Sequence, residues 1–254
     1  MVLWLDNLLS QIGGPIIFLG QVTKTYFKSF GRLPEIYDQI LSVSYQSAST
    51  TMFAGFFVGG IMALQFIMQV QVFDALPFLG GLVTSGTIRE VGPLLIAFLL
   101  SGKIGAYTSA ELGTMKVTEQ IDAIRCLGAD PVREIIVPRF VGIIVASFFL
   151  LTLGLMCSFF GGVVMAQVFS GLPWEQYIKH IPTIMTYQSV ISGFVKCLVF
   201  SIVIATLCTY RGYTVFGGAR EVGEGVVQAA TQTMITLVLA DNISSFILER
   251  VLDV

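Results

Sequence analysis

Residues 140–174, FVGIIVASFFLLTLGLMCSFFGGVVMAQVFSGLPW, contain no Asp, Glu, Lys or Arg. A second charge-free stretch runs from residue 39 to residue 73. A helix needs roughly 20 apolar residues to cross the hydrocarbon core of a bilayer. Each stretch is long enough for one crossing, and together they predict an all-α membrane protein.

The composition of the whole chain points the same way. Of its 254 residues, 12% are charged and 55% are hydrophobic, and the mean hydropathy is +0.83. Soluble domains carry roughly 25% charged residues. So small a polar fraction argues against a soluble enzyme, and a net charge of −2 argues against a nucleic-acid-binding domain, which needs a strongly basic surface.

Apolar runs divide the chain into an N-terminal segment, residues 1–40, and a single transmembrane domain, residues 41–254. We expect about five spans, at about 44–70, 91–112, 138–168, 187–210 and 229–250. In the N-terminal segment, Phe18, Val22 and Tyr26 are interleaved with Lys24 and Lys28, which is typical of a helix that lies in the membrane interface. The alternative is a sixth span at about 12–31.

The distribution of basic residues predicts the orientation of these spans. Cytoplasmic loops carry an excess of Lys and Arg. With the N-terminus in the cytoplasm and the C-terminus outside, nine basic residues lie inside and three outside. The inner ones are Lys24, Lys28, Arg32, Lys116, Arg125, Arg133, Arg139, Arg211 and Arg220, and the outer ones are Arg89, Lys179 and Arg250.

Small residues recur at four-residue spacing in the first two predicted spans. They are Gly55, Gly59 and Ala63, and then Gly102 and Ala106. Such spacing lets helices approach closely in lipid. The four cysteines form no CxxC pair and have no metal-ligand spacing, so we expect neither a metal site nor a disulfide framework.

The longest polar segment between spans, residues 111–139, contains a predicted amphipathic helix at about 118–128. Thr118 is placed to cap its start, and Gly128 is placed to end it. Its apolar stripe is Val117, Ile121, Ile124 and Leu127. Such a helix either rests on the membrane surface as a connector or docks in a groove of a cytoplasmic partner and transmits motion to the spans.

Several stretches resemble the MlaE/YrbE family of ABC-transporter permeases, the membrane subunits of Mce-associated phospholipid transport systems. These stretches are FFVGGIMALQ (56–65), the block TIREVGPLLIAFLLSGKIGAYTSAELGTMKVTEQIDAIRCLGADPVREIIVPR (87–139), KCLVFSIVIATLCTYRGY (196–213) and the loop from Gly217 to Gly225. The resemblance covers most of the chain from about residue 40 onward. One departure is the last cytoplasmic loop, which Glu221 and Glu224 make acidic.

The resemblance implies five spans preceded by an interfacial helix, in a homodimer in the bacterial inner membrane. It implies a cytoplasmic ATPase dimer, a STAS-domain protein and a periplasmic Mce-domain hexamer as partners. Transport of phospholipid between the inner membrane and the Mce partner would maintain outer-membrane lipid asymmetry. Residues of the coupling helix toward the ATPase would be Glu119, Gln120, Ile121, Asp122, Ala123, Arg125 and Leu127.

Arg89 and Glu90 lie at the outer end of the second predicted span. Charged groups inside a membrane are costly unless they are paired or hydrated. By resemblance, these two residues line the mouth of a lipid-binding cavity at the dimer interface, with an apolar part formed by Leu64, Gln65 and Leu94. The alternative is an ordinary interfacial anchor.

Four other charged residues fall within spans, and for these we expect structural roles. Lys103 and Glu111 are candidates for pairing between helices, Lys196 is placed to extend its ammonium group toward the interface, and Asp241 lies on the fifth span. An ion-gradient-driven carrier or channel is the alternative function, and it would use Arg89, Glu90, Lys103 and Asp241 as a relay.

The sequence lacks the motif of an ATPase. Around Lys103, Ala97 replaces the first glycine of a P-loop, and Ile104 stands where Ser or Thr is required. We therefore expect a transport subunit with no catalytic residues and no cofactor of its own. ATP and Mg²⁺ would bind to the partner ATPase.

Overall fold

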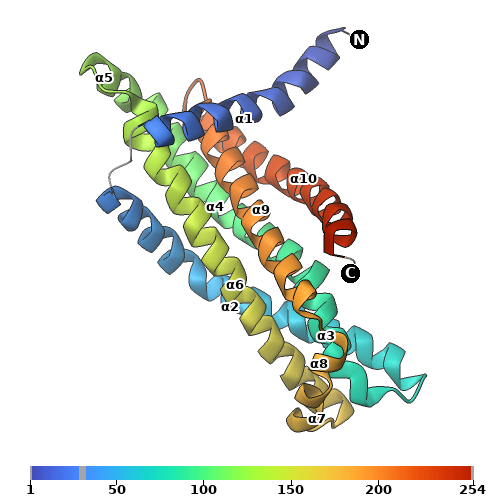
Figure 1. Ribbon diagram of the computed structural model, residues 1–254. Helices are drawn as coiled ribbons and strands as arrows, with labels where there is room; N and C mark the ends of the chain where they lie inside the picture. Colours follow the sequence, from blue (N-terminus) through green and yellow to red (C-terminus); the bar gives the residue numbers. More distant parts are fainter. Residues whose placement is uncertain (1, 29–32, 253–254) are drawn as a thin grey trace. The chain divides into compact units, whose positions relative to one another are not determined.

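The structure, a computed structural model, describes residues 2–28 and 33–252, with side chains described for residues 13–27 and 33–251. Every regular element in this part is helical (Figure 1). The elements are α1 (Val2–Lys28), α2 (Leu33–Gln71), η1 (Leu76–Phe78), α3 (Leu79–Gly86), η2 (Thr87–Val91), α4 (Gly92–Val117), α5 (Gln120–Cys126), η3 (Val132–Ile136), α6 (Val137–Ser170), α7 (Trp174–Lys179), α8 (Ile181–Ile184), α9 (Tyr187–Tyr213) and α10 (Ala219–Leu252).

Four helical runs of the described residues are long and apolar enough to cross a membrane, which confirms the all-α membrane class. They are Leu33–Gln71, Leu76–Val117, Val132–Ser170 and Tyr187–Tyr213, and they contain the first four predicted spans. The fifth predicted span lies within α10, a helix of 34 residues that is not among the four. Polar residues such as Gln228, Thr231 and Gln232 lower its hydropathy.

The N-terminal segment contributes α1, in which Pro15 is included, and the first residues of α2, which begins at Leu33. Phe18 and Val22 are buried, and the Phe18 ring lies 5.6 Å from the ring of Tyr210 on α9. The opposite side of α1 exposes Ile16, Ile17 and Phe27. Arg32, one of the predicted inner basic residues, lies outside the described residues.

The second run begins well before the predicted start at residue 91. A 3-10 turn, α3 and a π-helical turn, η2, precede α4 without a break. Gly92 follows the π turn because a Cβ there would lie 2.5 Å from the Thr87 carbonyl oxygen. The glycines, Thr84 and the Arg89–Glu90 pair interrupt the apolar pattern, which is why hydropathy alone does not predict this part of the helix.

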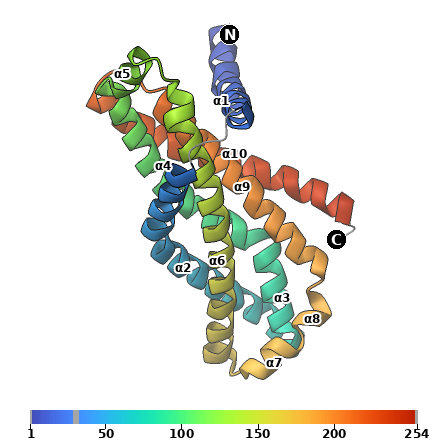
Figure 2. The ribbon, with the colours of Figure 1, turned by 60° about the vertical axis from the view of Figure 1, so that its left-hand side comes forward.

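The contacts divide the chain into two compact units. The first unit comprises Met1–Ser44, Ser101–Ala146 and Ile202–Ile235, and the second comprises Tyr45–Leu100, Ser147–Ser201 and Thr236–Val254. In the second unit, α7 and α8 pack beside α3 (Figures 1 and 2). Leu79, Val83 and Tyr177 are almost completely buried in this core.

The second unit contains a close helix crossing that the spacing of small residues predicts. A Cβ added at Gly55 would collide with the Gly154 carbonyl, and one at Gly59 would collide with the Ser158 carbonyl. These glycines therefore let α2 and α6 approach backbone to backbone. Gly102 has only Met234 within 4 Å, so a close approach there, which the spacing predicts within the chain or between two copies, is not made within this chain; in the first unit the tighter approach is at Gly105, beside the Cys208 sulfur.

We expect Gly59→Ala to lower the thermal stability of the purified protein in detergent, because the new methyl group must displace backbone atoms of α6. Overpacking of this kind costs about 1–3 kcal/mol. The control is Gly20→Ala on α1, where nothing lies within 4 Å of the added Cβ, so its melting temperature stays the same or rises. Equal stability of the two variants would contradict the close crossing.

Candidate functional site

The short amphipathic helix exists as α5, Gln120–Cys126, within the first unit. It does not begin with a Thr118 cap as predicted. The Thr118 hydroxyl and backbone N–H both donate to the Thr114 carbonyl, at 2.8 and 2.9 Å, so Thr118 completes the last turn of α4. The chain turns at Glu119, which adopts the left-handed conformation with φ 59°.

The C-terminus of α5 forms as predicted, at Gly128. Its φ is +80°, which favours glycine. The Gly128 N–H donates to the Arg125 carbonyl at 3.0 Å, and the Ala129 N–H donates to the Ile124 carbonyl at 3.2 Å. This is the Schellman pattern, and it turns the chain sharply toward η3.

The predicted apolar stripe of α5 is only partly buried. Ile121 is fully buried, whereas Val117 and Ile124 are half-buried and Leu127 is 85% exposed. Leu127 is therefore not covered by this chain, and its predicted contact with the ATPase stays a prediction. Five of the predicted coupling residues are exposed: Glu119, Gln120, Ala123, Arg125 and Leu127.

Ion pairs hold α5 against its own chain. Lys116 Nζ lies 3.0 Å and Arg125 NH1 lies 3.1 Å from the Asp122 carboxylate. Arg125 NH2 also donates to the Tyr213 hydroxyl at the end of α9, at 2.8 Å. Asp122 thus faces the chain itself, and these contacts join α5 to the ends of α4 and α9.

A further ion pair joins the two helices that flank α5. Arg139 on α6 is 8% exposed, and its NH2 donates to Glu111 Oε1 on α4 at 2.7 Å. Glu111 therefore does pair between helices, as the sequence predicts, and its partner is Arg139. If α5 is displaced, it therefore acts on α4 and α6, which this ion pair already joins.

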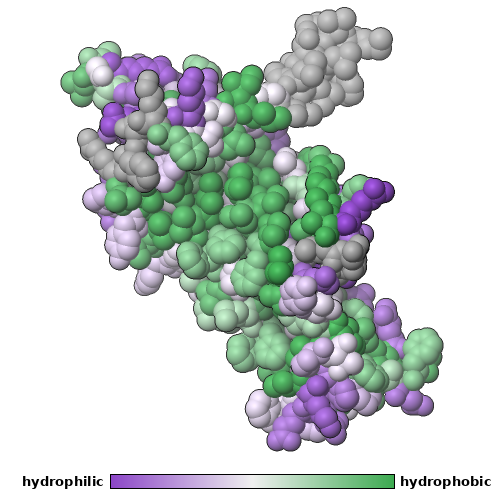
Figure 3. All heavy atoms as spheres, viewed as in Figure 1, coloured by the Kyte–Doolittle hydropathy of each residue, from purple (hydrophilic) through white to green (hydrophobic). Residues whose placement is uncertain are grey.

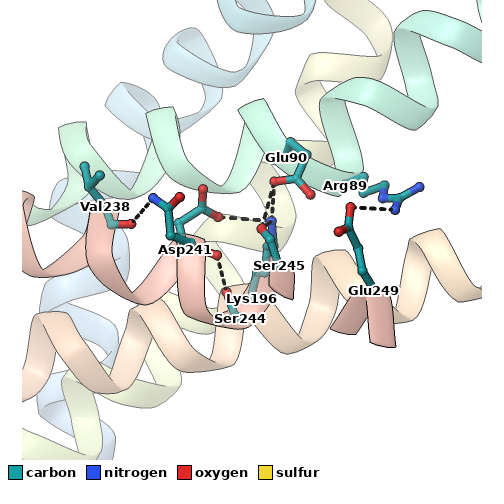
Figure 4. A network of polar contacts seen from close by, with 9 residues as sticks. Arg89, Glu90, Lys196, Val238, Asp241, Ser244, Ser245 and Glu249 are labelled. Atoms are coloured by element: carbon teal, nitrogen blue, oxygen red, sulfur yellow. Dashed lines mark hydrogen bonds and ion pairs between the residues drawn. The ribbon is translucent and has the colours of Figure 1, made fainter. Parts of the chain in front are cut away.

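The second unit contains a buried network of charged side chains (Figure 4). Lys196 on α9 is fully buried, and its Nζ lies 2.5 Å from Glu90 Oε2 and 3.0 Å from Asp241 Oδ1. It also donates to the Ser245 hydroxyl at 2.7 Å, and that hydroxyl lies 3.1 Å from Glu90 Oε2. The ammonium group thus has two hydrogen-bond acceptors, Glu90 and Ser245, and a second carboxylate, Asp241, at ion-pair distance.

This network corrects one prediction and bears on two others. Lys196 does not extend toward the interface, because two carboxylates neutralise it inside the helices. Asp241 has the structural role that we expect for it. Arg89 NH2 lies 3.4 Å from Glu249 Oε1, so Arg89 and Glu90, adjacent in sequence, point to different partners (Figure 4).

Sequence reasoning does not anticipate Ser245 and Glu249 as members of this network. The signal that could have found the pairing is the presence of isolated charges of opposite sign, Lys196 and Asp241, on two neighbouring spans. The other predicted lipid-site residues are accessible: Gln65 is exposed and Leu64 and Leu94 are half-buried. None of the five lines the apolar groove of the second unit, which is formed by α3, η2, α6, α8 and α9.

The surface of these helices is divided by polarity. In Figure 3, hydrophobic residues dominate the face over α6 and α9, while hydrophilic residues gather over α5 and over α7. The exposed residues of α6 include Phe149, Met156 and Phe160. Apolar sides of this kind suit contact with lipid, and the polar short helices suit contact with water or with partners.

Residues 36–247 match the family model of the permease MlaE. The chain belongs to the MlaE permease family. It is therefore a multi-pass membrane protein and the permease subunit of an ABC transporter, which works with an ATPase partner and is not itself catalytic. The family match includes α5, the residues around Lys196 up to Ser245, most of α2 and every helix from α3 to α9.

Relatives of this permease come from distant sources. An intermembrane phospholipid transport system permease protein MlaE from Haemophilus influenzae is 29% identical over 244 residues, 90% of this chain and 91% of its own. A probable ABC transporter permease protein from Rickettsia typhi is 29% identical over 84% of this chain and 82% of its own. The chloroplastic protein TRIGALACTOSYLDIACYLGLYCEROL 1 from Arabidopsis thaliana is 26% identical over 90% of this chain and 65% of its own.

We expect Lys196→Met to destabilise the permease, because it leaves the largely buried Asp241 carboxylate without its cation. The measurement is the melting temperature and the monodisperse yield in detergent. Combining Lys196→Met with Glu90→Gln and Asp241→Asn restores most of the loss. The control Lys179→Met, at an exposed position on α7, changes neither quantity, and a similar effect of both single variants would refute the ion-pair argument.

Proposed function

We propose that this permease moves phospholipid between the bacterial inner membrane and a periplasmic Mce-domain hexamer, and so maintains outer-membrane lipid asymmetry. It would act as a homodimer with a cytoplasmic ATPase dimer and a STAS-domain protein. The transported substrate class is suggested by the printed name of the Haemophilus relative. ATP and Mg²⁺ would bind to the ATPase, and this chain would need no cofactor.

The observation that carries the proposal is the geometry of α5. Its free side presents Gln120, Ala123 and Leu127, which follow one another along one helical face. Its other side is fixed by buried Ile121 and by the ion pairs of Asp122. A helix held so tightly can be pushed as a rigid body, whereas a loosely tethered helix would absorb the push.

We propose five spans, with α10 as the fifth and α1 lying in the interface. In the second unit, α10 exposes Leu239, Ile243, Phe246 and Ile247, an apolar side suited to lipid. In the first unit, its polar side is used internally: Gln232 Oε1 accepts a hydrogen bond from Arg211 Nε at 2.6 Å. The excess of basic residues supports a cytoplasmic N-terminus and a periplasmic C-terminus.

In the proposed cycle, ATP binding closes the ATPase dimer and displaces α5. Asp122 and Arg125 pass the displacement to α4 and α9 through Lys116 and Tyr213. The lipid cavity between two copies, lined by Leu64, Gln65, Arg89, Glu90 and Leu94, then opens or collapses. An ion-gradient carrier is less well supported, because Glu90 and Asp241 are already ion-paired with Lys196; such a carrier would stop when the gradient is collapsed with ATP intact.

We expect Ala123→Arg to reduce co-purification of the ATPase roughly tenfold or more, since a mismatch of 1.4 kcal/mol at an interface already gives a factor of ten. The long charged side chain would occupy the exposed face of α5 without disturbing buried Ile121. Gln176→Arg adds the same charge to an exposed position on α7 and leaves co-purification unchanged. Normal ATPase binding and lipid transfer by the Ala123→Arg variant would rule out α5 as the coupling helix.

The lipid cavity is tested with a photoreactive amino acid at Gln65 in the complete transporter. We expect labelling of phospholipid from this position to depend on ATP, because the cavity changes shape during the cycle. The control position is Phe149, which is 63% exposed on α6 and should label surrounding lipid equally with and without ATP. Labelling at Gln65 that is absent, or that ignores ATP, would argue against this placement.

A further inference from the structure

The segment 214–228, which joins α9 to the first turns of α10, belongs to the first unit and takes no part in the proposed cycle. It is packed firmly against α4. Val222 lies on Gly113, where an added Cβ would be 3.0 Å from Val222 Cγ1. Gly225 leaves room for Val215, which is buried. Because these contacts fix the backbone of the segment, its exposed side chains form an ordered surface.

Phe216 projects from this segment and is 78% exposed. Gly217, whose φ is +120°, turns the chain directly after it. The Lys116 ammonium lies 5.6 Å from the centre of the Phe216 ring, a cation–π contact, and the same ammonium pairs with Asp122 on α5 at 3.0 Å. Phe216 and α5 thus share one side chain of α4, so a protein that docks on α5 has Phe216 within its reach.

Phe216 lines a hollow of about 220 Å³ together with Arg211, Glu221 and Glu224. This volume is below the roughly 300–1,000 Å³ of small-molecule sites and suits a single inserted side chain. The Arg211 guanidinium already donates to two glutamines of α10. Since two carboxylates face the hollow against this one guanidinium, an inserted side chain that carries a positive charge fits best.

The two glutamates differ in what they already bind. Glu221 caps the start of α10, because its Oε2 accepts a hydrogen bond from the Gly218 N–H at 2.8 Å. Glu224 pairs with Arg220, one turn earlier, at 3.1 Å, and that arginine side chain is 86% exposed. An exposed pair of this kind contributes little to stability. Glu224, which also lines a second hollow of about 460 Å³, can therefore exchange Arg220 for a cation of another protein.

We propose that Phe216 and Glu224 form a second docking surface for the ATPase, beside α5. Phe216 is the aromatic anchor that packs on an apolar part of the ATPase, and a Lys or Arg of the ATPase enters the hollow and pairs with Glu224. A bilayer surface fits less well, because the anionic head groups of the cytoplasmic leaflet repel the carboxylates beside Phe216. The inference rests on the proposed function in one respect, namely that the side of α5 faces the ATPase.

The first test replaces Phe216 with photoreactive benzoylphenylalanine in the complete transporter in its native membrane. We expect a cross-link to the ATPase, in a peptide that contains Lys or Arg. The control is the same replacement of Trp174, an exposed aromatic residue on α7 in the second unit, which gives no product with the ATPase. The absence of an ATPase product from position 216, or products with lipid or the STAS-domain protein alone, would overturn the proposal.

Charge reversal gives a second readout. Glu224→Lys lowers co-purification of the ATPase roughly tenfold or more, as the loss of a close charge pair at an interface does, and leaves the melting temperature of the permease unchanged. The matched control Glu175→Lys, at an exposed position on α7, changes neither quantity.

Comparison with Ala123→Arg separates this inference from the proposed role of α5. If Ala123→Arg loses the ATPase and Glu224→Lys keeps it, α5 remains the coupling helix and the second docking surface is wrong. If Glu224→Lys loses the ATPase and Ala123→Arg keeps it, the docking surface stands and the role of α5 is wrong. Normal ATPase binding by both variants contradicts both proposals.

Discussion

An ammonium group among membrane-spanning helices must be neutralised by the protein itself, and the second unit is built around this requirement. The hydrocarbon of the bilayer offers no water to Lys196, so Glu90 and Ser245 accept its hydrogen bonds and Asp241 adds a second negative charge at 3.0 Å. Close packing makes these contacts possible: one turn before Lys196, Gly193 lets α9 lie against the Ile88 carbonyl. The requirement thereby fixes where η2, α9 and α10 meet in this unit.

In the first unit, the few charged residues have a different role. There the charged residues surround α5 and its flanking helices, where they tie short elements together. Lys116, Asp122 and Arg125 form one chain of contacts that continues to Tyr213, and Arg139 joins Glu111 across α4 and α6. Because these pairs are partly exposed, each contributes little to stability, and their value lies in setting the orientation of α5.

The sequence predicts features that depend on local chemistry or on long stretches without charged residues. The first and third spans follow from charge-free stretches, the end of α5 follows from Gly128, and the α2–α6 crossing follows from Gly55 and Gly59. Features that depend on distant partners are harder to predict. Lys196 meets Glu90 across 106 positions, and no local pattern indicates that distance or the contact with Ser245. The exposure of Leu127 depends on where the helix ends, which periodicity does not specify.

The π turn at Thr87–Val91 accommodates one residue more than an α-helical turn would. That extra residue determines the directions in which two sets of side chains point. Ile88 lines the apolar groove of the second unit, while Arg89 and Glu90 enter the ion pairs. In an ordinary α-helix each residue advances the helix by about 100°. Without the extra residue, α3 would be rotated by about that angle against residues 92–100, and the groove residue and the charged residues would not occupy their present faces of one continuous helix.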